Sequence, residues 1–159
     1  MGPAHSFEGF RPDRVIEAQG CVLMPGLVDL WARLRKPGSA VGGSLESELK
    51  AGAAGGVTSL VCPPDTDPVL DEPGLVDMLR QRTQQLGHCR VFPLGALTRG
   101  LQGEGLTEMV ELTQAGCVGF SQGEEPVRDT RVLMRALQYA STHGFGVRLR
   151  PLDAWLGHG

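Results

Sequence analysis

The sequence lacks the features that mark several common classes of protein. It has no run of about 18 apolar residues, which a membrane-spanning helix would require, and its N-terminus has no basic and apolar signal pattern. The net charge is −3, so there is no excess of cationic groups to attract nucleic acid or an anionic membrane. These absences predict a cytoplasmic protein that binds neither nucleic acid nor membranes.

Cysteine pairs and dinucleotide-binding motifs are also missing. No two of the four cysteines form a C-x-x-C pair, and most of them lie within apolar stretches. We therefore expect small, buried, unpaired cysteines in a reducing compartment. No G-x-G-x-x-G follows the first strand-like run, which gives little support to a dinucleotide-binding fold.

The sequence does contain a repeat in which strand-like runs alternate with helical periodicity. A glycine precedes most of the runs, as expected where a helix ends, and Ser44 and Asp129 are good N-cap residues. The apolar, strand-like runs begin near residues 27, 57, 89, 117 and 145. The predicted helices cover residues 44–54, 72–86, 104–115 and 130–143.

This alternation predicts an α/β fold with a parallel sheet. The runs VTSLVC and CRVFPL are almost continuous in apolar residues, which is typical of strands covered by helices. Five such units fit either a doubly wound sheet or part of a (β/α)8 TIM barrel, and a whole barrel needs about 250 residues. An open arc of strands has two unpaired edges, so we expect an oligomer or a partner that covers them.

The same patterns divide the chain into three parts. Residues 1–26 include the stretch RVIEAQGCVLMPG, whose alternation of apolar and polar residues predicts an N-terminal β segment of an accessory β element. Residues 27–150 hold the five strands and four helices of a partial βα barrel. Residues 151–159 form a C-terminal tail.

Histidine is missing from the places where catalysis is expected. Active sites of parallel βα folds lie at the carboxyl ends of the strands. His88 and His143 precede strand-like runs and so belong to the opposite end, while His5 and His158 lie in the terminal segments. Because scattered carboxylates without histidines or paired cysteines make a poor zinc site, we expect no metal cofactor.

Several motifs nevertheless resemble those of one family, the dihydroorotases among the cyclic amidohydrolases. The resemblance implies a (β/α)8 barrel with a small β-sandwich built from both chain ends, to which residues 1–26 would belong. It also implies zinc-dependent, reversible ring closure of carbamoyl-aspartate to dihydroorotate in pyrimidine biosynthesis. The motifs are MPGLVDL-x-x-x-LR-x-PG at 24–38, AGAAGGVTSLV and PDTDPVLDEP within 51–73, GALTRGLQGEGLTEM at 95–109, and AGCVGFS and PVRDTRVLMRALQYA within 115–140.

The resemblance further implies where zinc ligands would stand, and most of these positions have changed. In the family the first strand ends in Asp-x-His-x-His; here Asp29 is retained, but Trp31 and Arg33 occupy the histidine positions. An aspartate that follows Phe-Ser is replaced by Gln122, and a histidine at the end of the fifth strand is replaced by Arg150. We predict that these metal-ligand positions are degenerate and bind no zinc.

Two further positions correspond to substrate-binding residues of the family. Arg35 is retained, whereas Asp65 replaces an asparagine and would repel a substrate carboxylate. We regard both as vestigial.

The arginines at ligand positions also oppose a metal electrostatically. A guanidinium is charged at any workable pH, and at an effective dielectric of about 20 a unit charge about 4 Å from a divalent ion opposes it by roughly 8 kcal/mol. We expect the arginines to pair with Asp29, Asp65 and Glu124 in a packed, salt-bridged end, with Trp31 as a plug. The alternative is that the arginines form a pocket for an anionic ligand.

These observations lead to three hypotheses about function. The first is a catalytically inactive dihydroorotase homologue that serves as a structural or regulatory partner of aspartate carbamoyltransferase, as the resemblance implies for such members. The second is an active zinc-dependent dihydroorotase or cyclic amidohydrolase with unusual ligands. The third is a non-functional, truncated fragment of such an enzyme. We expect the first, and hence a protein that is not an enzyme.

Overall fold

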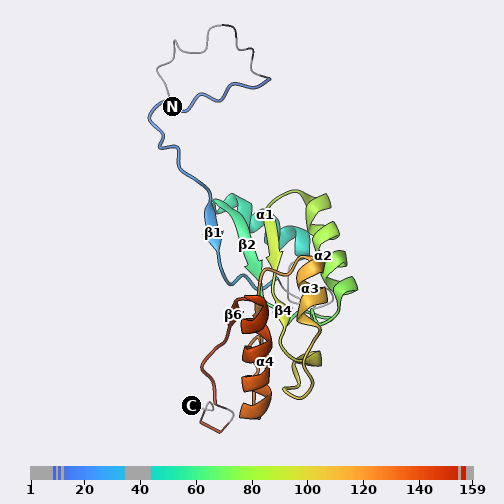
Figure 1. Ribbon diagram of the computed structural model, residues 1–159. Coiled ribbons are helices and arrows are strands. Elements are labelled where there is room, and N and C mark those ends of the chain that lie inside the picture. The colour runs from blue at the N-terminus through green and yellow to red at the C-terminus, as the bar shows by residue number, and fades with distance from the viewer. Residues whose placement is uncertain (1–8, 10, 12, 35–43, 154, 157–159) are drawn as a thin grey trace.

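Strands and helices alternate along the chain, as the sequence predicts. The computed structural model describes residues 9, 11, 13–34, 44–153 and 155–156 (Figure 1). The elements are β1 (Leu27–Asp29), α1 (Leu45–Ala54), β2 (Val57–Cys62), α2 (Pro73–Leu86), β3 (Arg90–Pro93), β4 (Gly95–Ala96), η2 (Arg99–Leu101), α3 (Met109–Ala115), β5 (Phe120–Ser121), α4 (Thr130–His143) and β6 (Val147–Arg148).

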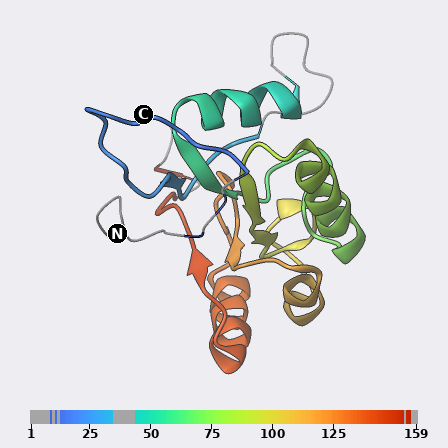
Figure 2. The ribbon, with the colours of Figure 1, turned by 90° about the horizontal axis from the view of Figure 1, so that it is seen from above.

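The strands form a parallel arc made of two short sheets. The first sheet has the order β1-β2-β3 and the second the order β4-β5-β6, with all four pairings parallel. Only Leu94 separates β3 from β4; its N–H donates to the carbonyl of Cys62, at 2.8 Å, and the next N–H, of Gly95, donates to Gly119, at 2.9 Å. The helices lie along the outer side of this arc (Figure 2).

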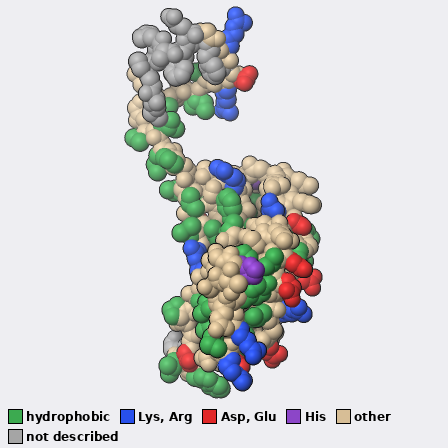
Figure 3. Space-filling view, in the orientation of Figure 1, with side chains coloured by type: hydrophobic (Ala, Val, Ile, Leu, Met, Phe, Trp, Pro, Cys, Tyr) green, Lys and Arg blue, Asp and Glu red, His purple; other side chains and the backbone are tan. Residues whose placement is uncertain are grey.

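The chain before β1 extends away from the arc. Residues 13–26 form no strand in the structure, and every one of them is exposed. Figure 3 shows hydrophobic side chains along this segment and down the side of the molecule that carries β1. The assignment of residues 1–26 to an accessory β element therefore stays a prediction.

The local sequence explains where the helices begin and end. The Ser44 side chain accepts a hydrogen bond from the N–H of Ser47, at 3.2 Å, and caps α1, and Asp129 caps α4 by accepting from Arg131, at 2.8 Å. Pro73 stands in the first turn of α2, where its missing N–H costs nothing. No helix in the described part of the chain is long and apolar enough to cross a bilayer.

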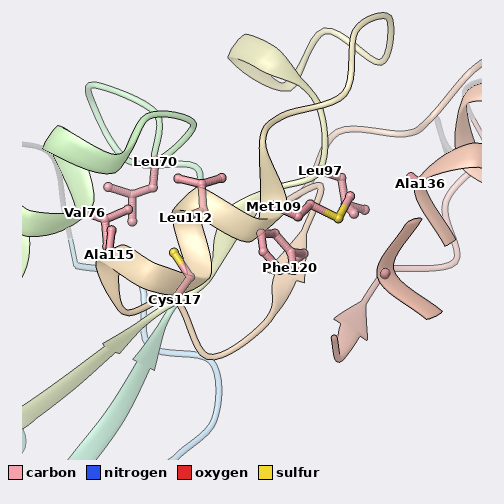
Figure 4. Close-up of a cluster of buried hydrophobic side chains, with 10 residues drawn as sticks. Leu70, Val76, Leu97, Met109, Leu112, Ala115, Cys117, Phe120 and Ala136 are labelled. Atoms are coloured by element: carbon pink, nitrogen blue, oxygen red, sulfur yellow. The ribbon is translucent and has the colours of Figure 1, made fainter. Parts of the chain in front are cut away.

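Two apolar clusters join the helices to the strands. The larger one packs α2, α3 and α4 around Leu97 and Phe120, and Figure 4 shows Met109 of α3 beside Phe120 of β5. The smaller one packs Leu45 and Leu49 of α1 against Leu60 and Cys62 of β2. Each helix therefore buries one face on the arc, which is the layer arrangement expected of an α/β fold.

Three expectations about individual elements were wrong. The third predicted strand is broken into β3 and β4. Helix α3 begins at Met109, not at 104, because the preceding residues form a loop in which Thr98 and Leu106 make an antiparallel bridge. Val28 and Leu30 belong to the first strand-like run, which would be buried if both of its faces were covered, but they are 60% and 54% exposed because β1 is an edge strand.

Gly116, which ends α3, is required for two separate reasons. Its φ of +111° is a backbone conformation that residues with a Cβ rarely adopt. A Cβ built there would also lie 2.5–2.8 Å from atoms of the Arg80 guanidinium. That guanidinium donates to the carbonyl of Ala115, at 2.7 Å, and so holds α2 to the end of α3. Gly144 at the end of α4 has a φ of +69° but nothing within 4 Å of a Cβ.

We expect Gly116→Ala to lower the free energy of unfolding by about 2–4 kcal/mol, because it adds a displaced Arg80 to the backbone strain. The control Gly144→Ala carries the backbone strain alone and should lower it by about 1 kcal/mol. Urea unfolding followed by circular dichroism measures both values. Equal losses in the two variants would show that the contact with Arg80 does not matter.

Candidate functional site

A hollow lies at the carboxyl ends of the strands, where the sequence places the site. Its volume is about 880 Å³, and we name it the carboxyl-end hollow. It is walled by the segments that follow β1, β2, β4 and β5. Its lining residues are Arg33, Leu34, Cys62, Pro63, Asp65, Thr66, Val69, Gly100, Leu101, Gln102, Glu104, Glu124, Glu125, Pro126 and Arg128.

A chain of ion pairs crosses one side of this hollow. Arg33, after β1, pairs with Asp65, after β2, and lies 3.6 Å from Glu124, after β5. The other carboxylate oxygen of Glu124 pairs with Arg150, after β6. Four strand ends are thereby joined through Glu124, and the predicted pairing of Arg33 and Arg150 with Asp65 and Glu124 is confirmed.

The exposure of these groups corrects the expectation of a packed end. The Arg33 and Arg150 side chains are 51% and 59% exposed, and Arg33 lines an open hollow. Together with Asp65 and Glu124 they carry no net charge, and solvent screens exposed ion pairs strongly. The repulsion of a metal by the arginines is therefore weaker than about 8 kcal/mol each. What opposes a metal at these positions is the lack of donor atoms.

Trp31 does not plug the hollow, contrary to expectation. It is half-buried outside the hollow, and its backbone N–H donates to the Asp29 carboxylate, at 2.9 Å. Its ring lies 5.9 Å from the Arg148 guanidinium carbon, within cation–π range. Arg148 also donates to the carbonyl of Leu30, so this one side chain of β6 reaches across to the end of β1.

The Gln122 side chain forms hydrogen bonds with the neighbouring loop. Its side chain is 1% exposed, and its amide nitrogen donates to the Thr98 hydroxyl, at 2.8 Å, and to the carbonyl of Leu101, at 2.9 Å. Its amide oxygen accepts from the Thr98 hydroxyl, at 3.0 Å. An ionised aspartate could accept here but could not donate to Leu101. Gln122 thus supports the loop that lines the hollow.

The remaining predicted residues lie apart from these contacts. Asp29 pairs with none of the arginines in the part of the chain that the structure describes, and Arg99 lies 3.6 Å from Glu108. Arg35 lies outside the described residues, so its predicted role stays a prediction. The His143 ring stacks on Phe145 and meets Tyr139 edge to face, with ring centroids 5.3 Å apart in each pair.

The residues at the ligand positions do not fit a zinc ion. Arginine has no acceptor atom, tryptophan donates only, and the Gln122 oxygen already accepts a hydrogen bond. Asp29 alone offers a carboxylate. Among the described residues no group of three or more histidine, cysteine or acidic side chains is placed to hold a metal.

Three features of the site were missing from the sequence-based prediction. Cys62 lines the hollow, Arg148 reaches β1, and Thr98 anchors Gln122. The single available signal was the spacing of Arg148 and Arg150, because side chains two residues apart in an extended segment lie on one face.

The fold and the position of the hollow define a class of protein. Parallel strands with helices on their outer side and a polar hollow at their carboxyl ends are the arrangement of βα-barrel enzymes and their relatives. Dihydroorotase from Saccharomyces cerevisiae, solved in complex with 5-fluoroorotic acid, has a similar fold, with a TM-score of 0.61 and 14% identity. The similarity covers 80% of this chain and 36% of the yeast chain.

Comparison with known sequences identifies the family. The model of the Dihydro-orotase-like family matches residues 20–144. The chain is 45% identical to a dihydroorotase-like protein of Pseudomonas aeruginosa, over 95% of this chain and 36% of the relative, and 35% identical to a dihydroorotase of Aquifex aeolicus, over 91% and 34%. The chain therefore belongs to the dihydroorotase-like family, and it spans about a third of the length of these relatives.

Cys62 offers a direct test of the geometry of the hollow. Burial raises the pKa of its thiol to about 12, and that of Cys117 also to about 12. Both are therefore protonated and unreactive at neutral pH, although Cys62 lies in the wall of the hollow. Cys89 is also buried, as expected, whereas Cys21 is exposed, contrary to the expectation of buried cysteines.

We expect iodoacetamide at neutral pH to modify Cys21 alone in the folded protein, because the other three thiols are buried. Intact-mass measurement should give one adduct on the native chain and four after unfolding in urea, which is the control. Rapid modification of Cys62 in the native state would mean that the hollow opens deeper than described.

Proposed function

We propose that this chain is a catalytically inactive member of the dihydroorotase-like family and a structural or regulatory partner of aspartate carbamoyltransferase. The observation that carries the first half is that the side chains at the ligand positions are engaged elsewhere. Arg33 and Arg150 pair with carboxylates, and Gln122 holds a loop. These contacts support a site in which no zinc is held.

The charges around the carboxyl-end hollow also support inactivity. Among the residues that the structure describes, the lining includes four carboxylates, on Asp65, Glu104, Glu124 and Glu125, and two guanidiniums, on Arg33 and Arg128. Carbamoyl-aspartate and dihydroorotate are anions, and an excess of negative charge disfavours their binding. The same balance weighs against the alternative of an anion pocket formed by the arginines.

The proposal also concerns how the strands of this chain correspond to those of a whole barrel. We propose that β1 to β6 correspond to the first five strands of an eight-stranded barrel, with β3 and β4 as one broken strand. Residues 1–26 would belong to an accessory β-sandwich. The partner is proposed from the resemblance to inactive family members, and a cytoplasmic location follows from a role in pyrimidine biosynthesis.

A working zinc-dependent dihydroorotase is the second candidate function. It is favoured by the relatives that are named dihydroorotase, one of which, from Pelobacter propionicus, is 44% identical over 79% of this chain. It would require metal ligands from outside the described residues or from a second chain.

We expect purified, tag-free protein to contain fewer than about 0.1 zinc per chain and to hydrolyse no dihydroorotate above the buffer rate, because the ligand positions offer no suitable donor set. Mass spectrometry of the metal content and a hydrolysis assay on the same sample measure both. An active dihydroorotase prepared in the same way is the control. About one zinc per chain with turnover would establish the second candidate instead.

The proposed partner, aspartate carbamoyltransferase, is tested in an experiment separate from the test of inactivity. We expect the chain to co-sediment with aspartate carbamoyltransferase and not with an unrelated protein of similar charge. If no complex forms in a sample that also lacks zinc and turnover, the proposed partner would be wrong, but the proposed catalytic inactivity would stand.

A further inference from the structure

A second hollow lies at the amino ends of the strands, which is the opposite end from the carboxyl-end hollow. Its walls are the end of α2, the turn from α2 into β3, the beginning of β2 and the turn that leads from α3 toward β5. Its volume is about 580 Å³, within the range of about 300–1,000 Å³ that small-molecule sites occupy. We name it the amino-end hollow.

The walls of the amino-end hollow belong to the middle of the arc. Strand β2 has β1 on its outer side, and β5 has β6 on its outer side. The two turns are fixed by their own hydrogen bonds, because the N–H of Gly87 donates to the carbonyl of Thr83, at 3.2 Å, and the N–H of Gly116 donates to that of Thr113, at 3.0 Å. The amino-end hollow is therefore not a product of either open edge of the arc.

The amino-end hollow carries an excess of positive charge. Arg80 of α2 and Arg90 of β3 line it together with the imidazole of His88, and no carboxylate lines it among the residues that the structure describes. Glu46 of α1, whose carboxylate interacts electrostatically with His88, is itself paired with Lys50, at 2.6 Å. The balance of charge is thus the reverse of that in the carboxyl-end hollow, where carboxylates outnumber guanidiniums.

The two guanidiniums keep both their charge and donors for a ligand. Arg80 donates one N–H to the carbonyl of Ala115, at 2.7 Å, and a guanidinium carries several further N–H groups. Because that carbonyl is neutral, the contact holds Arg80 in place without cancelling its charge. Within the described part of the chain, neither Arg80 nor Arg90 forms an ion pair. Two cations in one hollow without a counter-charge favour the binding of an anion.

We propose that the amino-end hollow binds a small organic phosphate whose phosphate group contacts Arg80 and Arg90. A phosphate monoester carries a charge of about −1.5 to −2 at neutral pH, which matches two guanidiniums better than the single charge of a carboxylate does. A phosphate ion alone would leave most of the hollow empty, whereas the Gln84 amide and the His88 ring, which also line it, can bond to the hydroxyl groups of an organic part. The hollow lies at the far end of the strands from the degenerate ligand positions, so this binding does not depend on the proposed inactivity.

The test is isothermal titration calorimetry of the 159-residue chain with ribose 5-phosphate, a phosphate monoester, at constant ionic strength. We expect a Kd below about 1 mM. The variant Arg90→Gln should weaken binding at least about 10-fold, because guanidinium–phosphate hydrogen bonds are charge-assisted. Arg90 is exposed, so the fold should be retained, with an unchanged circular dichroism spectrum.

The control Arg135→Gln removes the same charge from an exposed arginine of α4 that does not line the amino-end hollow, and it should bind ribose 5-phosphate as the wild type does. The proposal is overturned if the wild type shows no binding up to about 10 mM, if Arg90→Gln binds as the wild type does, or if Arg135→Gln weakens binding as much as Arg90→Gln. Inorganic phosphate, titrated separately, should bind more weakly. Equal affinity for inorganic phosphate would overturn the assignment of an organic phosphate, because the rest of the hollow would then contribute nothing.

Discussion

The arrangement of the carboxyl-end hollow depends on the carboxylate of Glu124, which binds two cations at once. One oxygen pairs with Arg150 and the other lies 3.6 Å from Arg33, which in turn pairs with Asp65. Because each residue follows a different strand, this chain of charges ties β1, β2, β5 and β6 together at the edge where a βα protein places its chemistry. The arginines are neutralised in place, so the hollow stays open while the positions implied for metal ligands are occupied by ion pairs.

Fold and function are determined by different residues of this chain. The arc rests on the apolar clusters beneath the helices and on the side-chain caps that begin α1 and α4. The chemistry rests on a few side chains at strand ends, and these can change while the arc persists. Gln122 illustrates this separation, because its buried amide supports the loop of Thr98 and Leu101 with a donor that an ionised carboxylate lacks.

The sequence was sufficient to predict the alternation of strands and helices, because Gly116 and Gly144 mark helix ends and Ser44 and Asp129 mark helix starts. It was sufficient to predict the position of the hollow and the partners of Arg33, because parallel strands bring their carboxyl ends together. It could not predict the exposure of Val28, which depends on what lies beside β1, nor the place of Trp31, which is set by Arg148 from the far end of the chain. Long-range contacts of this kind leave no local pattern.

The most direct test of the account is the free energy of unfolding of Glu124→Gln beside the wild type, each with and without a zinc chelator. Exposed ion pairs contribute roughly 0.2–1 kcal/mol each, so the loss of both pairs of Glu124 should lower stability by about 1 kcal/mol. The chelator should change the free energy of unfolding of neither protein. An unchanged stability in Glu124→Gln, together with a wild type that the chelator destabilises, would show that a metal and not the chain of charges holds the strand ends.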